Sequence, residues 1–419
     1  MENRICDLPD DLLLLILLLV PTKVAVATTV LSKRWRSVWT MLTHLDFKDD
    51  GSESLGWFIE QSLQLHKAPK LVSLIVKLGP RCTIDIDIRN WVESAVSRGV
   101  YLLDFRLLWT AEPTSFPKSL YTCDTLAHLT LSNEICVDVF SPARLPSLIC
   151  LSLLFVVYKD EDSLVRLLSS SSVLKILMVK RHEDDNLKRF TVKVPSLETL
   201  YYVTTWRNDE VDRNGLLVID APALIEMDLT DVLDDYCLIE NMPCLNEACI
   251  TFVPNPHDKF LRFLSSVRYL LLCLTTPMVK CCNAIEFPWL IEFYFIPEVS
   301  VDWLEPLIFL LQNSPKLKTL MINTKFEGLA PSWNQPSSIP GCLSSHLKMF
   351  GWRDYGGRGD EKQLVTYILA NSKCLKTVEI SLRATSNLEE KQKELECLPR
   401  ISTSSQLLFP TQVEWRFRT

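Results

Sequence analysis

A short acidic stretch is the part of this sequence closest to a site for chemistry. Its four aspartates could hold a cation or serve as general acid and base: Asp228, Asp231, Asp234 and Asp235. Acidic surface loops are far commoner than such sites. The histidines never pair at ligand spacing, and His182-Glu183 lacks the second histidine of a zinc-protease helix. We therefore predict no catalytic residue and no metal site.

A glycine cluster near the C-terminus is a second candidate. It runs Gly356-Gly357-Arg358-Gly359-Asp360 and contains an Arg-Gly-Asp triplet. Because it lacks the Gly-x-Gly-x-x-Gly pattern between a strand and a helix, we predict a turn. The chain has 11 glycines in 419 residues, and neither Gly-x-Ser-x-Gly nor a Walker sequence occurs. We expect no cofactor and no enzymatic activity from the chain itself.

Composition and charge narrow the class of partner. Hydrophobic residues make up 47% and charged residues 23%, as in folded proteins. Residues 51–344 hold 26 basic and 35 acidic side chains, and this acidic middle argues against nucleic acid. The apolar run from Leu12 to Val20 is nine residues long, too short to span a membrane, and no basic segment precedes it. The 14 cysteines form no Cys-x-x-Cys pair, which favours reduced thiols in a cytoplasmic or nuclear protein.

The first fifty residues predict three short helices. Pro9 suits the start of the first helix, and Pro21 ends its apolar run, which we interpret as a buried helix. So small a unit has too little interior for the leucine run and for both Trp35 and Trp39. Surplus apolar surface of this kind indicates a partner site.

These residues resemble an F-box. The resemblance covers residues 5 to about 45, in the segments Ile5-Cys6-Asp7-Leu8-Pro9-Asp10-Asp11-Leu12-Leu13, Val20-Pro21-Thr22-Lys23 and Val30-Leu31-Ser32-Lys33-Arg34-Trp35-Arg36. It implies a module that binds a Skp-family adaptor and, through it, the cullin of a cullin-RING ubiquitin ligase. The positions that the family keeps apolar are the adaptor surface implied by the resemblance: Leu8, Pro9, Ile16, Pro21, Leu31 and Trp35.

Other interpretations of this segment stay open. It could be only a helical cap on the strands that follow. Val24 stands where the family often has an acidic residue, which leaves room for a leucine-rich scaffold no longer coupled to a ligase. Lys33, Arg34 and Arg36 are more typical of a solvated helix face than of a nucleic-acid site.

A repeat fills the middle of the chain. An apolar-x-x-apolar-x-apolar pattern recurs 21 to 30 residues apart, close to the period of leucine-rich repeats. Its first positions are Leu71, Val100, Leu126, Leu148, Leu174, Leu197, Leu224, Leu245, Val267, Leu290, Leu317, Leu347 and Leu375. No asparagine column follows, so we predict an irregular solenoid of horseshoe type. An ordinary α/β domain with chance leucine alternation is the other interpretation.

Alternation along each strand predicts the binding face. The fourth and sixth positions point into the core, and the residue between them points out on the concave side. That column is Thr130, Ser152, Met178, Tyr201, Asp228, Cys249, Leu271, Tyr294 and Met321. We assign target binding to its large members, which are Met178, Tyr201, Leu271, Tyr294 and Met321. A register slip of one residue would send the whole column inward. If Tyr201→Ala and Tyr294→Ala left both target binding and stability intact, the site would lie on rim loops such as residues 205–215.

The C-terminal part resembles the FBD domain of plant F-box and leucine-rich-repeat proteins. The resemblance rests on Leu347–Arg353, Tyr355–Arg358, Tyr367–Asn371, Leu375–Ile380, Leu388–Lys391, Leu398–Arg400 and Ser404–Phe409. It implies an α+β cap on the last strand. We expect a long loop between repeats at residues 325–344, because prolines and serines gather there.

The whole sequence thus predicts an α/β protein of four parts. They are an F-box at 1–50, irregular leucine-rich repeats at 51–336, an FBD domain at 337–410 and a tail at 411–419. The predicted function is substrate recognition in an SCF-type ubiquitin ligase, with an unknown target protein and neither nucleic acid nor membrane as partner. The alternatives are a leucine-rich-repeat scaffold, or a receptor in which a small molecule completes a protein interface.

Overall fold

The computed structural model divides into two compact units, Met1–Leu197 and Glu198–Thr419. It describes residues 8–49, 51, 53–82, 87–108, 112–182, 186–204, 215–232, 236–240, 242–253, 255–257, 260–282, 285–324, 336–383, 387–414 and 416. No helix within these residues is both long and apolar enough to cross a bilayer.

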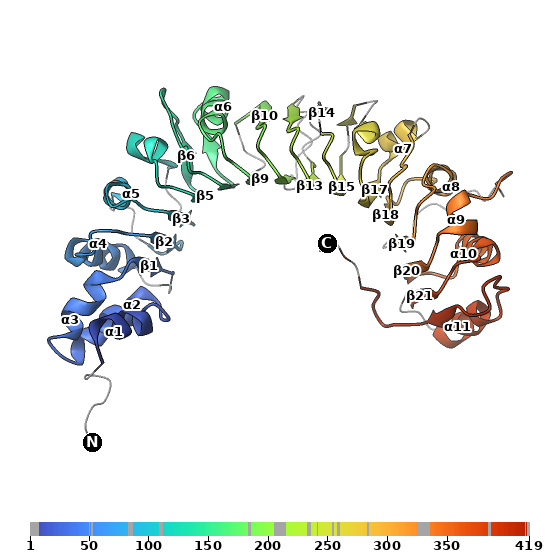
Figure 1. The fold of residues 1–419 in the computed structure, drawn as a ribbon, viewed down its shortest axis with the longest axis horizontal. Helices are drawn as coiled ribbons and strands as arrows, with labels where there is room; N and C mark the ends of the chain where they lie inside the picture. Colours follow the sequence, from blue (N-terminus) through green and yellow to red (C-terminus); the bar gives the residue numbers. More distant parts are fainter. Residues whose placement is uncertain are drawn as a thin grey trace, which may run out of the picture. The chain divides into compact units, whose positions relative to one another are not determined.

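Unit 1 begins with a cluster of short helices (Figure 1). They are α1 (Asp10–Leu17), α2 (Thr22–Ala27) and α3 (Trp35–Val38), with the 3-10 turns η2 (Thr28–Val30) and η3 (Trp39–Met41). Pro9 and Pro21 precede α1 and α2, where a missing N–H leaves no helical hydrogen bond unmade. Arg34 secures the start of α1, since its Nε lies 2.7 Å from Asp10 Oδ1 and its Nη2 donates to the Leu8 carbonyl at 2.6 Å.

Parallel strands follow directly in unit 1. They pair in the order β1 (His44–Phe47), β2 (Ser73–Leu78), β3 (Leu102–Leu107), β5 (His128–Asn133), β7 (Cys150–Leu154) and β9 (Ile176–Arg181). The connections lie on one side of this ladder (Figure 1) and contain α4 (Leu55–Leu65), α5 (Ile88–Ser97), η4 (Lys118–Thr122) and α6 (Glu161–Ser169). Three of them add a small parallel sheet of β4 (Thr114–Ser115), β6 (Ile135–Val137) and β8 (Val157–Tyr158), and β10 (Arg189–Lys193) packs on α6.

Unit 2 continues the same plan. Its ladder is β11 (Thr199–Thr204), β13 (Glu226–Thr230), β15 (Glu247–Phe252), β17 (Tyr269–Leu274), β18 (Glu292–Pro297), β19 (Thr319–Asn323), β20 (Met349–Tyr355), β21 (Thr377–Leu382) and β22 (Gln406–Leu408). One face is covered by α7 (Thr276–Cys282), α8 (Leu304–Gln312), α9 (Gly341–Ser345), α10 (Gly359–Asn371) and α11 (Leu388–Glu396) (Figure 1). The remaining elements are η5 (Phe260–Leu264) and the short parallel strands β12 (Leu216–Asp220), β14 (Tyr236–Ile239) and β16 (Asn255–Pro256).

The predicted repeat register is confirmed. Every side chain at the first, fourth and sixth positions of the thirteen repeats is at most 2% exposed. Neighbouring strands pair without a shift at the column between these positions, as in Tyr294↔Met321 and Met321↔Gly351. Each repeat therefore supplies one strand to the ladder and three apolar side chains to the core. Connections made variously of helix, 3-10 turn or short strand account for the irregular repeat length.

Only part of the glycine cluster forms the predicted turn: Gly356–Arg358 link β20 to α10, whereas Gly359 and Asp360 are the first residues of α10, so the prediction of a turn there was wrong. Gly357 has φ +78°, a conformation that side chains other than glycine rarely adopt. The Glu361 carboxylate accepts the backbone N–H groups of Gly356 at 3.0 Å and Arg358 at 3.1 Å, which fixes the start of α10. The expected loop at 325–344 was too long, since α9 begins at Gly341, and residues 325–335 lie outside the described residues.

Candidate functional site

The first candidate surface is an apolar patch on the N-terminal helices. Only Leu13 and Leu17 of α1 are buried, so the prediction that the whole apolar run is buried was wrong. A helix of eight residues that packs on α3 and η3 can hide one stripe of its surface, and the rest faces solvent. The exposed large apolar side chains among residues 8–31 form the set that we call the exposed patch: Leu12, Leu15, Ile16, Leu18, Leu19, Val24, Val30 and Leu31.

The predicted adaptor residues divide into exposed and buried ones. Pro9, Ile16, Pro21 and Leu31 are exposed, and Leu8 is half-buried. Trp35 is 3% exposed, so the prediction that it contacts a partner directly was wrong. Its indole ring lies on the inner side of α3, where a module with so little interior gains most from a large side chain.

Sequence reasoning missed the two most exposed members of the patch. Leu19 and Val30 are each 85% exposed, and these are the two highest values among the large apolar residues that the structure describes. Leu19 follows the last turn of α1, and Val30 ends η2. The signal was present, because a leucine run in so small a module must leave some leucines outside.

The patch is joined closely to the strands of unit 1. Only two residues separate η3 from β1, and the Thr40 carbonyl accepts the backbone N–H of Lys67 at 2.8 Å. His66 is buried with its Nε2 2.7 Å from the Leu42 carbonyl and its Nδ1 facing the Arg98 guanidinium. Burial lowers the pKa of His66, and the nearby positive charge of Arg98 lowers it further, although the Leu42 hydrogen bond opposes the shift. A neutral His66 suits this contact.

The second candidate surface is the face of the unit 2 ladder opposite its helices. The column predicted to point out of the core does lie on this face, in the order Tyr201, Asp228, Cys249, Leu271, Tyr294 and Met321. A parallel column two residues earlier in each strand carries Glu226, Glu247, Tyr269 and Glu292. This face therefore combines an apolar floor with an acidic border.

Two tyrosines are tied to that acidic border. The Tyr201 hydroxyl donates to Glu226 at 2.9 Å, and the Tyr294 hydroxyl donates to Glu292 at 3.1 Å. Burial, together with the neighbouring carboxylate, raises the pKa of each tyrosine to about 12. Burial also raises the pKa of the Asp228 carboxyl, with Glu226 adding to the shift.

The C-terminal tail covers the middle of this column. Val413 is 1% exposed and packs in one cluster with Cys249, Leu271, Tyr294, Ile296 and Met321, which we call the floor patch. Leu271, Tyr294 and Met321 are at most 5% exposed, so the prediction that they are exposed was wrong. The register was right, and the cause of burial is the chain's own tail, which runs along this side of unit 2 (Figure 1).

Met178 and Tyr201 differ from these three residues. Both are half-buried. Met178 belongs to unit 1, in a column with Thr130 and Ser152, and the exposed Ile176 lies two residues earlier on the same face. The rim loop at 205–215 lies outside the described residues apart from Gly215.

In the acidic stretch of Asp228 to Asp235, Asp231 has a structural role. Asp231 is fully buried, and its Oδ1 accepts the Thr204 hydroxyl at 3.2 Å, while the same Thr204 oxygen accepts the Val232 N–H at 2.6 Å. Asp228 lies on the sheet face, whereas Asp234 and Asp235, like Glu183 after His182, are outside the described residues. Within the described ranges no three His, Cys, Asp or Glu side chains gather as a metal site would require.

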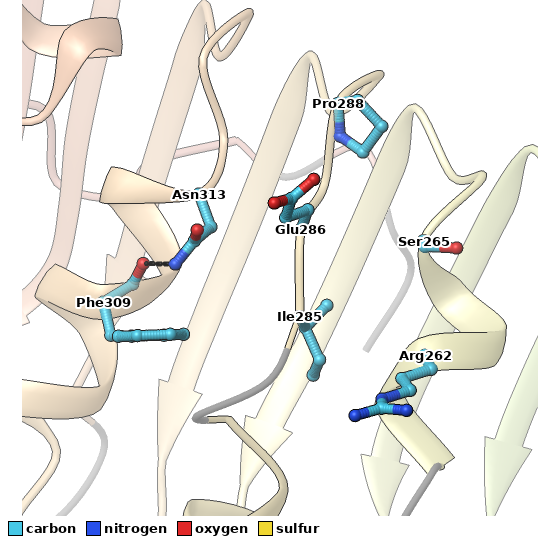
Figure 2. Close-up of a pocket in the computed structure, with 7 residues that line it drawn as sticks. All are labelled: Arg262, Ser265, Ile285, Glu286, Pro288, Phe309 and Asn313. Atoms are coloured by element: carbon cyan, nitrogen blue, oxygen red, sulfur yellow. Dashed lines mark hydrogen bonds between the residues drawn. The ribbon is translucent and has the colours of Figure 1, made fainter.

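A hollow on the other side of unit 2 does not resemble a receptor site. It lies between η5 and α8, and its lining includes Arg262, Glu286 and Asn313 (Figure 2). Its volume is about 670 Å³. The Asn313 side chain donates to the Phe309 carbonyl at 2.9 Å and so caps its own helix. The hollow offers one basic and one acidic side chain, and it lies away from the column of Tyr201 to Met321. It therefore gives no support to the interpretation of the chain as a small-molecule receptor.

Comparison with known proteins now identifies the family. Residues 5–47 match the F-box domain, residues 88–237 match the leucine-rich repeats described for FBD-associated F-box protein At5g56370, and residues 335–380 match FBD. The chain is 67% identical to Putative F-box/FBD/LRR-repeat protein At1g22000 of Arabidopsis thaliana, over 99% of this chain and 93% of that protein. It is 50% identical to Putative FBD-associated F-box protein At1g05080 of the same plant, over 97% of both chains. The chain belongs to the plant F-box/FBD/leucine-rich-repeat family.

Proposed function

We propose that this chain is the non-catalytic substrate-recognition subunit of an SCF-type cullin-RING ubiquitin ligase. The F-box binds a Skp-family adaptor and thereby a cullin, and the repeats bind a target protein. The chain forms no bond itself. It raises the concentration of the target beside the ubiquitin carrier.

One observation carries this proposal: within the residues matched by the F-box, the leucine, isoleucine and valine side chains of the exposed patch lie in solvent. Exposed apolar patches on a folded protein are typical of protein interfaces. The short link to β1 supports the proposal further, because it holds the adaptor surface steady against the strands of unit 1.

Several finer points belong to the same proposal. We place the domain boundaries at 50, 336 and 410, and we take the repeats of each unit to form a leucine-rich-repeat solenoid. The horseshoe stays a prediction. A cytoplasmic or nuclear location and the absence of nucleic acid and membrane as partners follow from the acidic repeats and reduced thiols.

Adaptor binding by the purified chain tests the proposal. Leu19→Asp/Val30→Asp places charge on the patch, and Leu8→Ala/Pro9→Ala removes apolar contact and a helix-start restraint. We expect each pair to weaken binding of a recombinant Skp-family adaptor by about 30-fold or more in calorimetry, as when a central interface residue is truncated.

The matched control is Trp57→Asp. Trp57 is 65% exposed on α4, outside the F-box match, so its replacement should leave adaptor affinity unchanged. If the wild-type chain binds no adaptor, or if both patch variants bind it as tightly as the wild type does, the ligase proposal fails and the scaffold interpretation takes its place.

A further inference from the structure

The tail of unit 2 holds the sheet face through two side chains three residues apart. Of the described tail residues 411–414 and 416, Val413 alone is buried, and it sits on the floor patch. Arg416 places its guanidinium 3.8 Å from the centre of the Tyr269 ring and its Nη2 3.0 Å from Glu247 Oε2. Thr411, Gln412 and Glu414 are exposed.

The sheet face matches these two anchors in shape and charge. Gly351 occupies the column next to Met321, and a Cβ there would lie 2.4 Å from the Met321 sulfur and 3.6 Å from Val413 Cγ1. The missing side chain leaves room for Met321 beneath the tail. Around the floor patch, Glu226, Glu247 and Glu292 line the border, so the face favours a cation beside an aliphatic group.

The tail can leave without disturbing the ladder. The last strand, β22, ends at Leu408, five residues before Val413. The Arg416 side chain is 42% exposed and Glu247 22%, so this ion pair lies at the rim of the contact. The tail can therefore be displaced by another segment that offers the same aliphatic and cationic side chains, since no core strand has to move.

We propose that this face is a docking site for an extended protein segment with an aliphatic residue followed three positions later by arginine or lysine, and that the C-terminal tail is its built-in competitor. The inference rests on the proposed function in one respect, which is that the repeats are the part of the chain that binds the target protein. It names the chemistry of the target segment and a step that regulates access to it.

The test measures binding of a fluorescent peptide of residues 409–419 to two full-length chains. In Val413→Asp/Arg416→Glu, which we call the open variant, the tail loses both anchors and the docking face is uncovered, whereas in the wild type the tail competes with the peptide. For a peptide Kd on the order of 0.1 mM and an effective tail concentration on the order of 1 mM, we expect about tenfold tighter binding to the variant. Thr411→Asp/Gln412→Glu adds acidic charge at exposed tail positions and should bind like the wild type.

A charge exchange identifies the site. Adding Glu247→Arg to the open variant should abolish binding of the wild-type peptide and restore it for a peptide carrying Arg416→Glu. Equal peptide affinity for the wild type and the open variant, or no binding to an open variant that keeps its circular dichroism, would overturn the proposal. If the double substitution disrupts folding, Arg416→Glu alone removes one anchor and should still strengthen peptide binding.

A tail seated on a second copy is a different arrangement, and sedimentation separates the two. A wild-type dimer that dissociates in the open variant would overturn the intramolecular assignment. None of these measurements involves the adaptor, so failure of the docking proposal and failure of the ligase proposal give separate results.

Discussion

Gly351→Ala is a sharp probe of the tail because it acts on Met321 from the neighbouring strand. The added methyl group would lie 2.4 Å from the Met321 sulfur and 2.6 Å from its terminal carbon, much closer than van der Waals contact. Met321 must therefore move. It is 2% exposed, with Val413 in the same cluster, so in the wild-type chain its movement pushes against the tail.

The expected cost follows from packing. Overfilling a well-packed site costs about 1–3 kcal/mol. Alanine also restricts the unfolded chain, which returns about 0.4–1 kcal/mol, and Gly351 lies in a strand without positive φ, so its backbone accepts alanine. We expect a net loss of about 1–2 kcal/mol in the wild type. In Val413→Asp/Arg416→Glu, Met321 can turn outward, and the same substitution should be nearly neutral.

Urea denaturation of the wild type, Gly351→Ala, Val413→Asp/Arg416→Glu and the combined variant gives the coupling energy between the Gly351 and tail substitutions directly. We expect it to be about 1–2 kcal/mol, as for residues that share one packed cluster. Equal cost of Gly351→Ala in both backgrounds would mean that the tail does not restrain Met321, and the reasoning about the covered face would be wrong.

Two further predictions concern unit 1. Trp35→Ala should destabilise the N-terminal helices by about 3–5 kcal/mol in thermal unfolding, because the Trp35 ring is buried. An unchanged melting curve would mean that the ring lies on the surface. His66 has a lowered pKa in the folded state against 6.5 ordinarily, so the unfolded chain binds the proton more readily and stability falls as pH drops below about 6.5. His66→Gln keeps a donor for the Leu42 carbonyl and should reduce the difference in unfolding free energy between about pH 7.5 and pH 5.5. The control His44→Gln changes an exposed histidine and should leave that difference unchanged. Equal pH dependence of stability in both variants would contradict this account of the contact between His66 and Arg98.

The repeats and their register could be predicted from local sequence patterns. Side chains alternate across a strand, so the apolar positions in Leu290-x-x-Phe293-x-Phe295 must share one face, and all three are buried. The link at Gly356–Arg358 was equally local, because a glycine with positive φ and a glutamate three residues into the helix decide it within six positions. The F-box was recognisable for the same reason, since its proline and leucine spacing is a short-range pattern.

The tertiary structure alone decided which of the predicted residues are accessible. Leu271 and Tyr294 have the predicted orientation, yet a segment without any periodic pattern covers them. Arg416 and Glu247 are 169 residues apart, and no propensity or spacing links positions so distant. Trp35 went inward for a related reason: burial depends on how much interior three short helices enclose together, and that volume is a property of their packing and not of any one helix.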